Sequence, residues 1–227
     1  MAECLEGLLA LMKKNIDEAA ADNDNECATL DLRDKWRAED FYVQATDAVY
    51  RKHEKRLKKL YDGKIDYQDV GTHNFWTLKY WKDLMEECNF HEDESFTRAE
   101  GNLCFYFSKF EVVDYQKNAM TYESLDWLSF LEAIGHIVRF KEMPKLEHLV
   151  SFAGVEDVVE LVEQLDAEGA SWNDFMGRYG EAGLAEGDDD VDPFHVRLDE
   201  LIKLLFHMRT KAAQKQKVAA KAAAEGE

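Results

Sequence analysis

The sequence predicts an all-α fold. Two prolines, Pro144 and Pro193, are the only ones in 227 residues, and proline is the residue that most strongly interrupts helices. Apolar residues recur every three or four positions in several stretches, which places them on one face of a helix. The hydrophobic fraction of 46% is ordinary for a globular protein, so these faces can bury a common core.

Two long helices are expected in the first segment of the chain, residues 1–61. The first covers about residues 2–21, and its apolar side chains at helical spacing are Leu5, Leu8, Leu9, Met12 and Ile16. After a polar connector, the second covers about residues 32–61 with a broken apolar stripe. The stripe is lost near His53, so we expect the charged end of this helix to extend into solvent or onto a partner.

The end of this helix leads into a motif with the spacing of an EF-hand calcium loop, residues 58–70. Such a loop needs oxygen ligands at fixed positions and a glycine at position 6 for a sharp turn. With Gly63 at position 6, Asp62 is at position 5, Asp66 at position 9 and Asp69 at position 12. The motif therefore predicts an EF-hand-like helix–loop–helix core.

The same alignment places unsuitable residues at two ligand positions. Position 1 is Lys58 and position 3 is Leu60, and a Lys ammonium repels the cation that a carboxylate would hold. We therefore expect no calcium binding and no metal cofactor at this loop. Two alternatives remain for Asp62, Asp66 and Asp69: a weak cation site, or a turn stabilised by their side-chain hydrogen bonds.

The second segment, residues 62–141, is expected to form this core from three helices. One covers about residues 75–87, and a second follows Ser95 or Thr97, either of which can cap its N-terminus. The third covers about residues 125–139 and is strongly amphipathic. We expect one shared core, whose aromatic members include Trp81, Phe107 and Phe130.

Three segments complete the chain. Residues 142–180 are expected to form an acidic helical extension, with two short helices broken at Gly154. Residues 181–192 read as an acidic linker. Residues 193–227 predict a long C-terminal helix with an Ala/Lys-rich tail that has high helix propensity but no apolar stripe. We expect this tail to become ordered against a partner.

The overall charge and the cysteines exclude several classes of protein. The net charge of −19 disfavours a nucleic-acid partner, because phosphate contacts need a basic surface. The chain has no run of about 20 apolar residues, so no membrane span is expected, and its N-terminus lacks the pattern of a secretory signal. Four widely spaced cysteines indicate reduced thiols, and therefore a cytoplasmic protein.

Two basic segments stand out against this acidic background, residues 51–59 and 209–221. The candidate partner-binding residues in them are Arg51, Lys52, Lys55, Arg56, Lys58, Lys59, Lys211, Lys215, Lys217 and Lys221. An acidic partner, such as a tubulin C-terminal tail, would pair with these side chains. The alternative is that they form solvated helix faces.

Two further groups have side chains that bind metals in other proteins. Cys88 and His91 have the spacing of half a zinc site, to which His73 and Cys104 could be brought near. The alternative is a cysteine on an apolar helix face beside a loop histidine. An acidic run could chelate a divalent ion, dock on a basic patch or form a solvated linker, and its members are Asp188, Asp189, Asp190 and Asp192.

A second pattern extends from Phe75 to Arg139. Its apolar and cysteine positions are Trp81, Leu84, Cys88, Phe90, Cys104, Phe105, Phe107, Leu125, Leu128, Phe130, Leu131 and Ile137. This pattern resembles the degenerate EF-hand-like repeat of ciliary and flagellar axonemal proteins, and it is distantly similar to the tubulin polymerization-promoting protein family. The Ala/Lys-rich tail is similar in style to proteins of green-algal flagella.

This resemblance implies a non-catalytic structural or adaptor subunit of a large cytoskeletal assembly. The ciliary or flagellar axoneme is the first choice, with tubulin or other axonemal proteins as partners. The sequence contains no phosphate-binding, nucleophile-elbow or metalloprotease motif, so we do not expect an enzyme. A calcium-responsive regulatory subunit and an accessory subunit of an organellar complex remain as alternatives.

Overall fold

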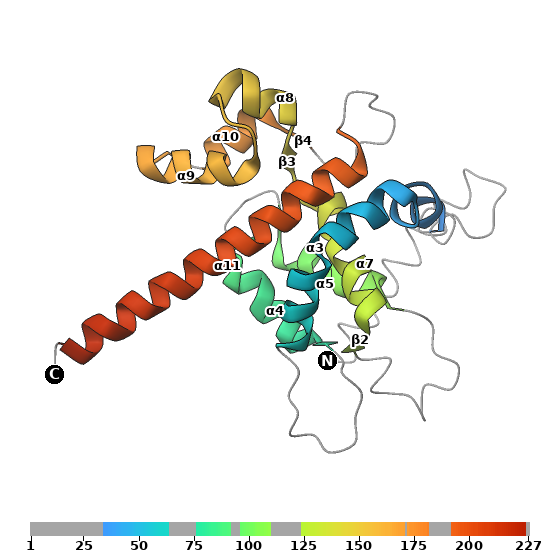
Figure 1. The fold of residues 1–227 in the computed structure, drawn as a ribbon, viewed down its shortest axis with the longest axis horizontal. Coiled ribbons are helices and arrows are strands. Elements are labelled where there is room, and N and C mark those ends of the chain that lie inside the picture. Colours follow the sequence, from blue (N-terminus) through green and yellow to red (C-terminus); the bar gives the residue numbers. More distant parts are fainter. Residues whose placement is uncertain are drawn as a thin grey trace, which may run out of the picture. The chain divides into compact units, whose positions relative to one another are not determined.

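A computed structural model describes residues 34–63, 76–91, 96–109, 124–170, 172–181 and 192–225, and these are mostly helical (Figure 1), which confirms the predicted all-α class. The chain divides into two compact units, Met1–Asp47 and Ala48–Glu227. The helix expected near residues 2–21 lies outside the described residues, and so does most of the acidic linker. Within the described ranges, no helix is long and apolar enough to cross a membrane.

The predicted helix over residues 32–61 is interrupted, which corrects the expectation of one continuous element. A π-helical turn, η1 (Arg37–Phe41), is followed by a bend, and α3 (Gln44–Asp62) begins beyond it. The rings of Trp36 and Phe41 pack 5.1 Å apart. The Thr46 hydroxyl donates a 2.6 Å hydrogen bond to the carbonyl of Asp40. These local contacts replace the regular hydrogen-bond ladder at the bend.

The core of the second unit contains α4 (Leu78–Glu87), α5 (Arg98–Phe107) and α7 (Trp127–Phe140). Two short strands, β1 (Trp76–Thr77) and β2 (Ser124–Leu125), immediately precede α4 and α7 and pair antiparallel with each other. Among the described elements the order is therefore helix, strand, helix twice, α3–β1–α4 and α5–β2–α7, and the ladder joins the two sets. The predicted helices over residues 75–87 and 125–139 are confirmed by α4 and α7.

Fully buried aromatic rings fill this core. The indole N–H of Trp76 donates to the Tyr61 carbonyl at 2.8 Å, and that of Trp81 donates to the Gly101 carbonyl at 2.7 Å. Trp81 and Phe130 are both fully buried, and their ring centres lie 6.4 Å apart. The indole N–H groups of Trp76 and Trp81 thus both have an acceptor, which a tryptophan buried in a core usually needs.

Phe107 does not belong to this core, which corrects the expectation that it packs with Trp81 and Phe130. Its side chain is 41% exposed, although its ring stacks on Phe140 at 6.2 Å. Phe107 is the last residue of α5, so its side chain lies at the edge of the helix face that packs inward. The expected cap of α5 is confirmed, because Thr97 and Glu100 form a reciprocal capping box.

The acidic extension forms several short elements. They are β3 (Met143–Pro144), α8 (Leu146–His148), η2 (Leu149–Ala153), α9 (Val158–Glu168), α10 (Trp172–Tyr179) and β4 (Gly180–Glu181), with β3 and β4 paired antiparallel. The predicted break at Gly154 is confirmed: this residue ends η2 with a φ of 70°, a conformation that glycine adopts at little cost. Asp157 caps α9 by accepting two backbone N–H groups.

The long helix α11 (Phe194–Glu225) contacts α4, α7 and α9, and Figure 1 shows it running past all three. Its first half buries Leu198, Leu201, Ile202 and Leu205, which confirms the predicted amphipathic helix. Its second half continues as helix to Glu225, and residues 213–219 of it are exposed. Asp192 precedes it and accepts the backbone N–H of Leu146 at 2.8 Å.

Candidate functional site

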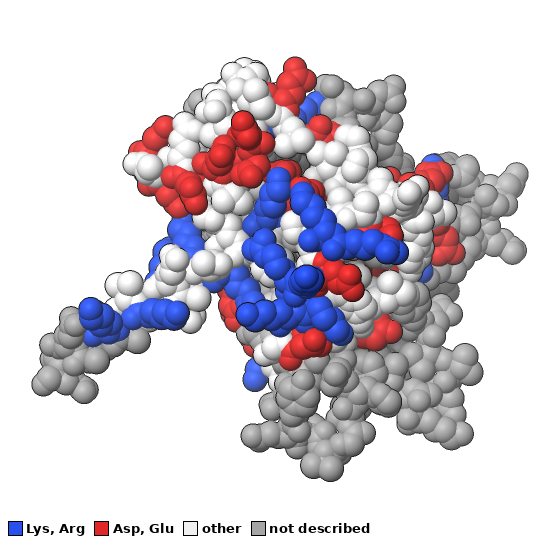
Figure 2. Space-filling view, in the orientation of Figure 1, with Lys and Arg blue, Asp and Glu red and all other residues white. Residues whose placement is uncertain are grey.

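Basic side chains gather on the exposed side of α3, here called the α3 basic face. It consists of Arg51, Lys52, Lys55, Arg56, Lys58 and Lys59, all of which are exposed. Figure 2 shows Lys and Arg side chains gathered over α3, and acidic side chains over α9. This arrangement concentrates positive charge on one helix of a chain whose net charge is −19.

The opposite side of α3 is buried, which corrects the expectation that the apolar stripe ends near His53. Tyr50, His53, Leu57 and Leu60 are all buried and recur at three- and four-residue spacing. The buried stripe thus continues through His53 to Leu57 and Leu60. A pattern of apolar residues misses this, because it counts histidine as polar. The basic side chains therefore stand on a helix that is held in place by packing, not on an extension into solvent.

Some of the basic residues fasten α3 to α11. The Lys52 ammonium and the His53 Nε2 lie 2.8 Å and 2.7 Å from the same oxygen of Asp199. The Arg56 guanidinium lies 4.1 Å from the centre of the Phe206 ring, a cation–π contact worth about 0.5–1 kcal/mol at an exposed site. Lys52 and Arg56 therefore have structural roles as well as charge.

Asp199 is held in its charged form by this environment. Partial burial acts to raise the pKa of its carboxyl group, but hydrogen bonds from Lys52 and His53 and the nearby Lys203 charge outweigh burial and lower the pKa to about 2. Lys203 also lies 2.5 Å from Glu200. Although burial acts to lower the pKa of Lys203, the hydrogen bond that its ammonium donates to Glu200 and the negative charge of Glu200 raise that pKa overall. The shifted pKa values keep the Asp199 carboxylate and the Lys203 ammonium charged at neutral pH.

Glu200 extends the network to α9. Its second oxygen accepts the backbone N–H of Val158 at 2.9 Å, at the N-terminus of α9, where a helix leaves donors without partners and favours negative charge. The Lys203 ammonium also lies 3.8 Å from Asp157. One charged cluster on α11 therefore fixes both α3 and α9.

Lys55 and Lys59 have a different position from Lys52 and Arg56. They lie one turn apart on the solvent side of α3, and neither forms an ion pair with any residue in the described part of the chain. Lys58, between them, lies 3.4 Å from Asp62 and 4.9 Å from the ring centres of Tyr61 and Trp127. Lys55 and Lys59 are thus the members of the α3 basic face most available to a partner.

Of the three aspartates proposed for a weak cation site, Asp62 alone lies among the described residues. Lys58 to Asp62, the first five positions of the expected loop, are the last turn of α3. Asp62 therefore projects from a helix and pairs with Lys58. Asp66 and Asp69 lie outside the described residues.

The possible zinc ligands are also separated. Cys88 is buried and its thiol donates to the Leu205 carbonyl at 3.6 Å, whereas the His91 ring stacks on Phe96 at 5.6 Å. Cys104 is buried on α5, and burial raises the pKa of its thiol well above the usual value. No group of three metal-binding side chains occurs within the described ranges. His73, Asp188, Asp189 and Asp190 lie outside them.

The basic residues of the tail divide into two groups. The Lys211 ammonium forms an ion pair with Asp166 of α9, and Lys215 lies one turn further on the same helix. Lys217 and Lys221 are exposed. The ion pair of Lys211 thus attaches the start of the tail to α9, and ordering of the rest against a partner stays a prediction.

The sequence did not predict a buried carboxylate–imidazole pair on α7. Glu132 and His136 lie one turn apart on α7, both almost fully buried, with Oε1 and Nε2 3.6 Å apart. The Tyr50 hydroxyl donates to the neighbouring Leu131 carbonyl at 2.8 Å, and burial together with the Glu132 charge raises the pKa of Tyr50. The available signal was two ionisable residues one turn apart on an otherwise apolar helix face.

Comparison with family models, curated proteins and solved structures gives no match to this chain.

Proposed function

We propose that this protein is a non-catalytic adaptor subunit of a large cytoskeletal assembly, and that the α3 basic face binds an acidic segment of a protein partner. The observation that carries the proposal is the combination of exposed Lys55 and Lys59 with a buried opposite face of the same helix. Because α3 is already packed, binding does not have to order the helix, which lowers the entropy cost of association.

The spacing of the basic residues suits an extended acidic chain. Residues four apart on one side of a helix are separated by about 6 Å along its axis, and alternate residues of an extended chain are separated by about 7 Å. An acidic segment that runs along α3 can therefore set a carboxylate beside each of Lys55 and Lys59. The acidic remainder of the molecule repels such a segment elsewhere and steers it to α3.

The arrangement of the core supports an EF-hand-like organisation and, with it, the axonemal setting. Among the described elements, the helix pairs α3 with α4 and α5 with α7 are joined where the strands β1 and β2 pair. Lys58, at the first ligand position of the expected loop, lies on α3 and pairs with Asp62, which supports an adaptor that does not depend on calcium. The first candidate partner is the acidic C-terminal tail of tubulin in a cilium or flagellum.

Binding of a fluorescent glutamate-rich peptide to the full chain tests this proposal. The double variant Lys55→Gln/Lys59→Gln should weaken binding about fivefold, because an exposed ion pair contributes ~0.5 kcal/mol. Added salt should weaken binding to the unmodified chain, since exposed charges are screened over about 10 Å at 0.1 M. Calcium should have no effect on the affinity.

The matched control is Lys79→Gln/Lys82→Gln, which removes two exposed positive charges from α4. If both double variants weaken binding equally, the peptide responds to net charge and the α3 site is wrong. Co-sedimentation of the same variants with microtubules then tests tubulin as the partner, and a fluorescent tag on the protein in ciliated cells tests the location. A tagged protein excluded from cilia would refute the axonemal assignment while leaving the peptide result intact.

A further inference from the structure

A surface of opposite charge lies at the start of α9, and it is here called the α9 acidic face. It consists of Glu156, Glu160 and Glu163, all of which are exposed. The Glu160 carboxylate accepts the backbone N–H of Glu156 at 2.9 Å. Glu156 and Glu160 form no ion pair with any residue in the described part of the chain. Glu163 lies 3.8 Å from His207 but keeps 66% of its side chain exposed.

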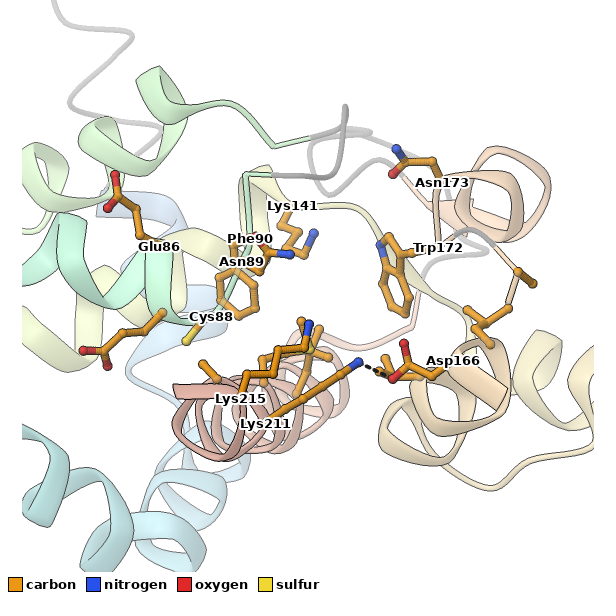
Figure 3. Close-up of a pocket in the computed structure, with 17 residues that line it drawn as sticks. Glu86, Cys88, Asn89, Phe90, Lys141, Asp166, Trp172, Asn173, Lys211 and Lys215 are labelled. Atoms are coloured by element: carbon orange, nitrogen blue, oxygen red, sulfur yellow. Dashed lines mark hydrogen bonds and ion pairs between the residues drawn. The ribbon is translucent and has the colours of Figure 1, made fainter. Parts of the chain in front are cut away.

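Two other acids near α9 are engaged within the molecule. Asp157 lies 3.8 Å from the Lys203 ammonium. Figure 3 shows the ion pair between Asp166 and Lys211 of α11. Because their charges are already paired, these two acids are not counted as part of the α9 acidic face. The three glutamates that form the face direct their charge to solvent instead.

The α9 acidic face and the α3 basic face have matching lengths. The lysines that are spread along α3 lie within residues 52–59, and the three glutamates lie within residues 156–163. A helix rises about 1.5 Å per residue, so each face extends over about 10 Å, or two helical turns. Each glutamate can therefore lie opposite a lysine when two such faces meet.

Both faces are fixed to the helix α11. The Lys52 ammonium lies 2.8 Å from Asp199, and the neighbouring Glu200 accepts the backbone N–H of Val158, at the N-terminus of α9, at 2.9 Å. Figure 2 shows the basic and acidic side chains on one side of the second unit. A two-fold axis that passes between two such faces places each of them on the opposite face of a second copy.

Exposed apolar side chains lie next to the α9 acidic face. Val150 and Phe152 are 62% and 58% exposed, and both belong to η2, which contacts α9. Exposed apolar groups that are rimmed by polar residues mark surfaces that bind other proteins. An exposed ion pair contributes little by itself, so apolar area beside the charged face adds to the binding energy that the charges supply.

We infer that a second copy of this chain occupies the α3 basic face, in a symmetric dimer where the α3 basic face of each copy lies on the α9 acidic face of the other. The net charge of −19 makes two copies repel each other. This repulsion is screened beyond about 8 Å at physiological salt, whereas the paired faces are in contact. The inference rests on the binding surface of the proposed function and adds its regulation. The dimer covers Lys55 and Lys59, so an acidic partner must displace the second copy.

Sedimentation velocity of the full chain at increasing concentration and about 0.15 M salt tests this dimer. The reversal variants Lys55→Glu/Lys59→Glu and Glu156→Lys/Glu163→Lys should each weaken dimerisation about 20-fold or more. Four ion pairs are lost per dimer, and each strengthens association about two- to threefold. An equimolar mixture of the two variants should recover the dimer, because the charges are then complementary in both contacts.

The matched control is Lys79→Glu/Lys82→Glu, at two exposed positions of α4. It changes the net charge as much as the α3 variant does, and it should change dimerisation less than about twofold. Misfolded variants would not recover on mixing, so circular dichroism of each variant is recorded first. A mixture of folded variants that stays monomeric would refute the paired faces. An unmodified chain that stays monomeric up to about 0.1 mM would refute the dimer.

The glutamate-rich peptide separates this inference from the proposed function. Glu156→Lys/Glu163→Lys keeps the α3 basic face, so it should bind the peptide at least as tightly as the unmodified chain does. The peptide should also dissociate the unmodified dimer. Peptide binding without a dimer would overturn the inference and leave the proposed function intact. A dimer without peptide binding would overturn the proposed function and, with it, the competition for the α3 basic face.

Discussion

The carboxyl group of Asp199 should make stability depend on pH. Its pKa is about 2 in the folded protein, against about 3.9 in an unfolded chain. The difference corresponds to ~2.5 kcal/mol of stability when the group is fully ionised. Because Asp199 is partly exposed to solvent, we expect screening to reduce this to about 1–2 kcal/mol.

The direction of the pH effect follows from the depressed pKa. The stabilisation is fully present above about pH 4 and is lost as pH falls toward 2, because the folded carboxyl group is then protonated. At pH 3 about half of it should remain. Asp199→Asn should therefore destabilise the protein by about 1–2 kcal/mol at pH 7 and by about half as much at pH 3.

Urea unfolding monitored by tryptophan fluorescence at the two pH values measures both differences. Glu54→Gln is the matched control, since Glu54 is an exposed acid on α3 and its amide variant should change stability by less than about 0.5 kcal/mol. A loss for Asp199→Asn that is the same at pH 7 and pH 3 would refute the electrostatic reasoning. A loss no larger than that of the control would show that the contacts between α3 and α11 carry no stability.

Three more predictions concern packing, backbone conformation and the tail. Trp81→Ala should lower the free energy of unfolding by about 3–5 kcal/mol, whereas Phe107→Ala should lower it by less than half as much because Phe107 is 41% exposed. Equal shifts in the thermal midpoint of the two variants would contradict this difference. Gly154→Ala should destabilise the protein by about 1 kcal/mol, because alanine is strained at the φ of 70° that Gly154 adopts. Gly177→Ala should instead stabilise the protein by ~0.5–1 kcal/mol, because Gly177 lies inside helix α10 with open space around it. Thermal unfolding of both variants tests whether the two changes have opposite signs. Amide exchange in residues 213–224 should be fast in the isolated chain and slow when a partner covers the tail, and protection in the isolated chain would argue against that role.

Local signals account for the elements that the sequence predicted well. The helix α7 follows from its apolar periodicity, and the break after η2 follows from Gly154. For the start of α5 the sequence offered Ser95 or Thr97 as the cap, and the structure has Thr97. Each signal depends on residues that are neighbours along the chain. The all-α class follows from the same kind of evidence, because helices are stabilised by hydrogen bonds within one segment.

The basic side chains of the candidate partner site were also readable from the sequence. Six Lys and Arg residues within residues 51–59 indicate a positive surface in any fold that leaves them exposed. The sequence did not indicate that the other side of this helix is buried. His53 interrupts the apolar pattern, and its partner Asp199 is 146 residues away.

Only the tertiary structure decided which residues meet. Lys141 is a single lysine at the end of a helix in the sequence, yet the fold buries it beside the rings of Phe90 and Trp172. Glu132 and His136 are buried for the same reason, since α7 is packed on several sides. The periodicity of a sequence determines which face of a helix is apolar. Which polar residues are buried on the same face depends on contacts between segments that are distant in the sequence. Those contacts form, and contribute to stability, only once the chain is folded.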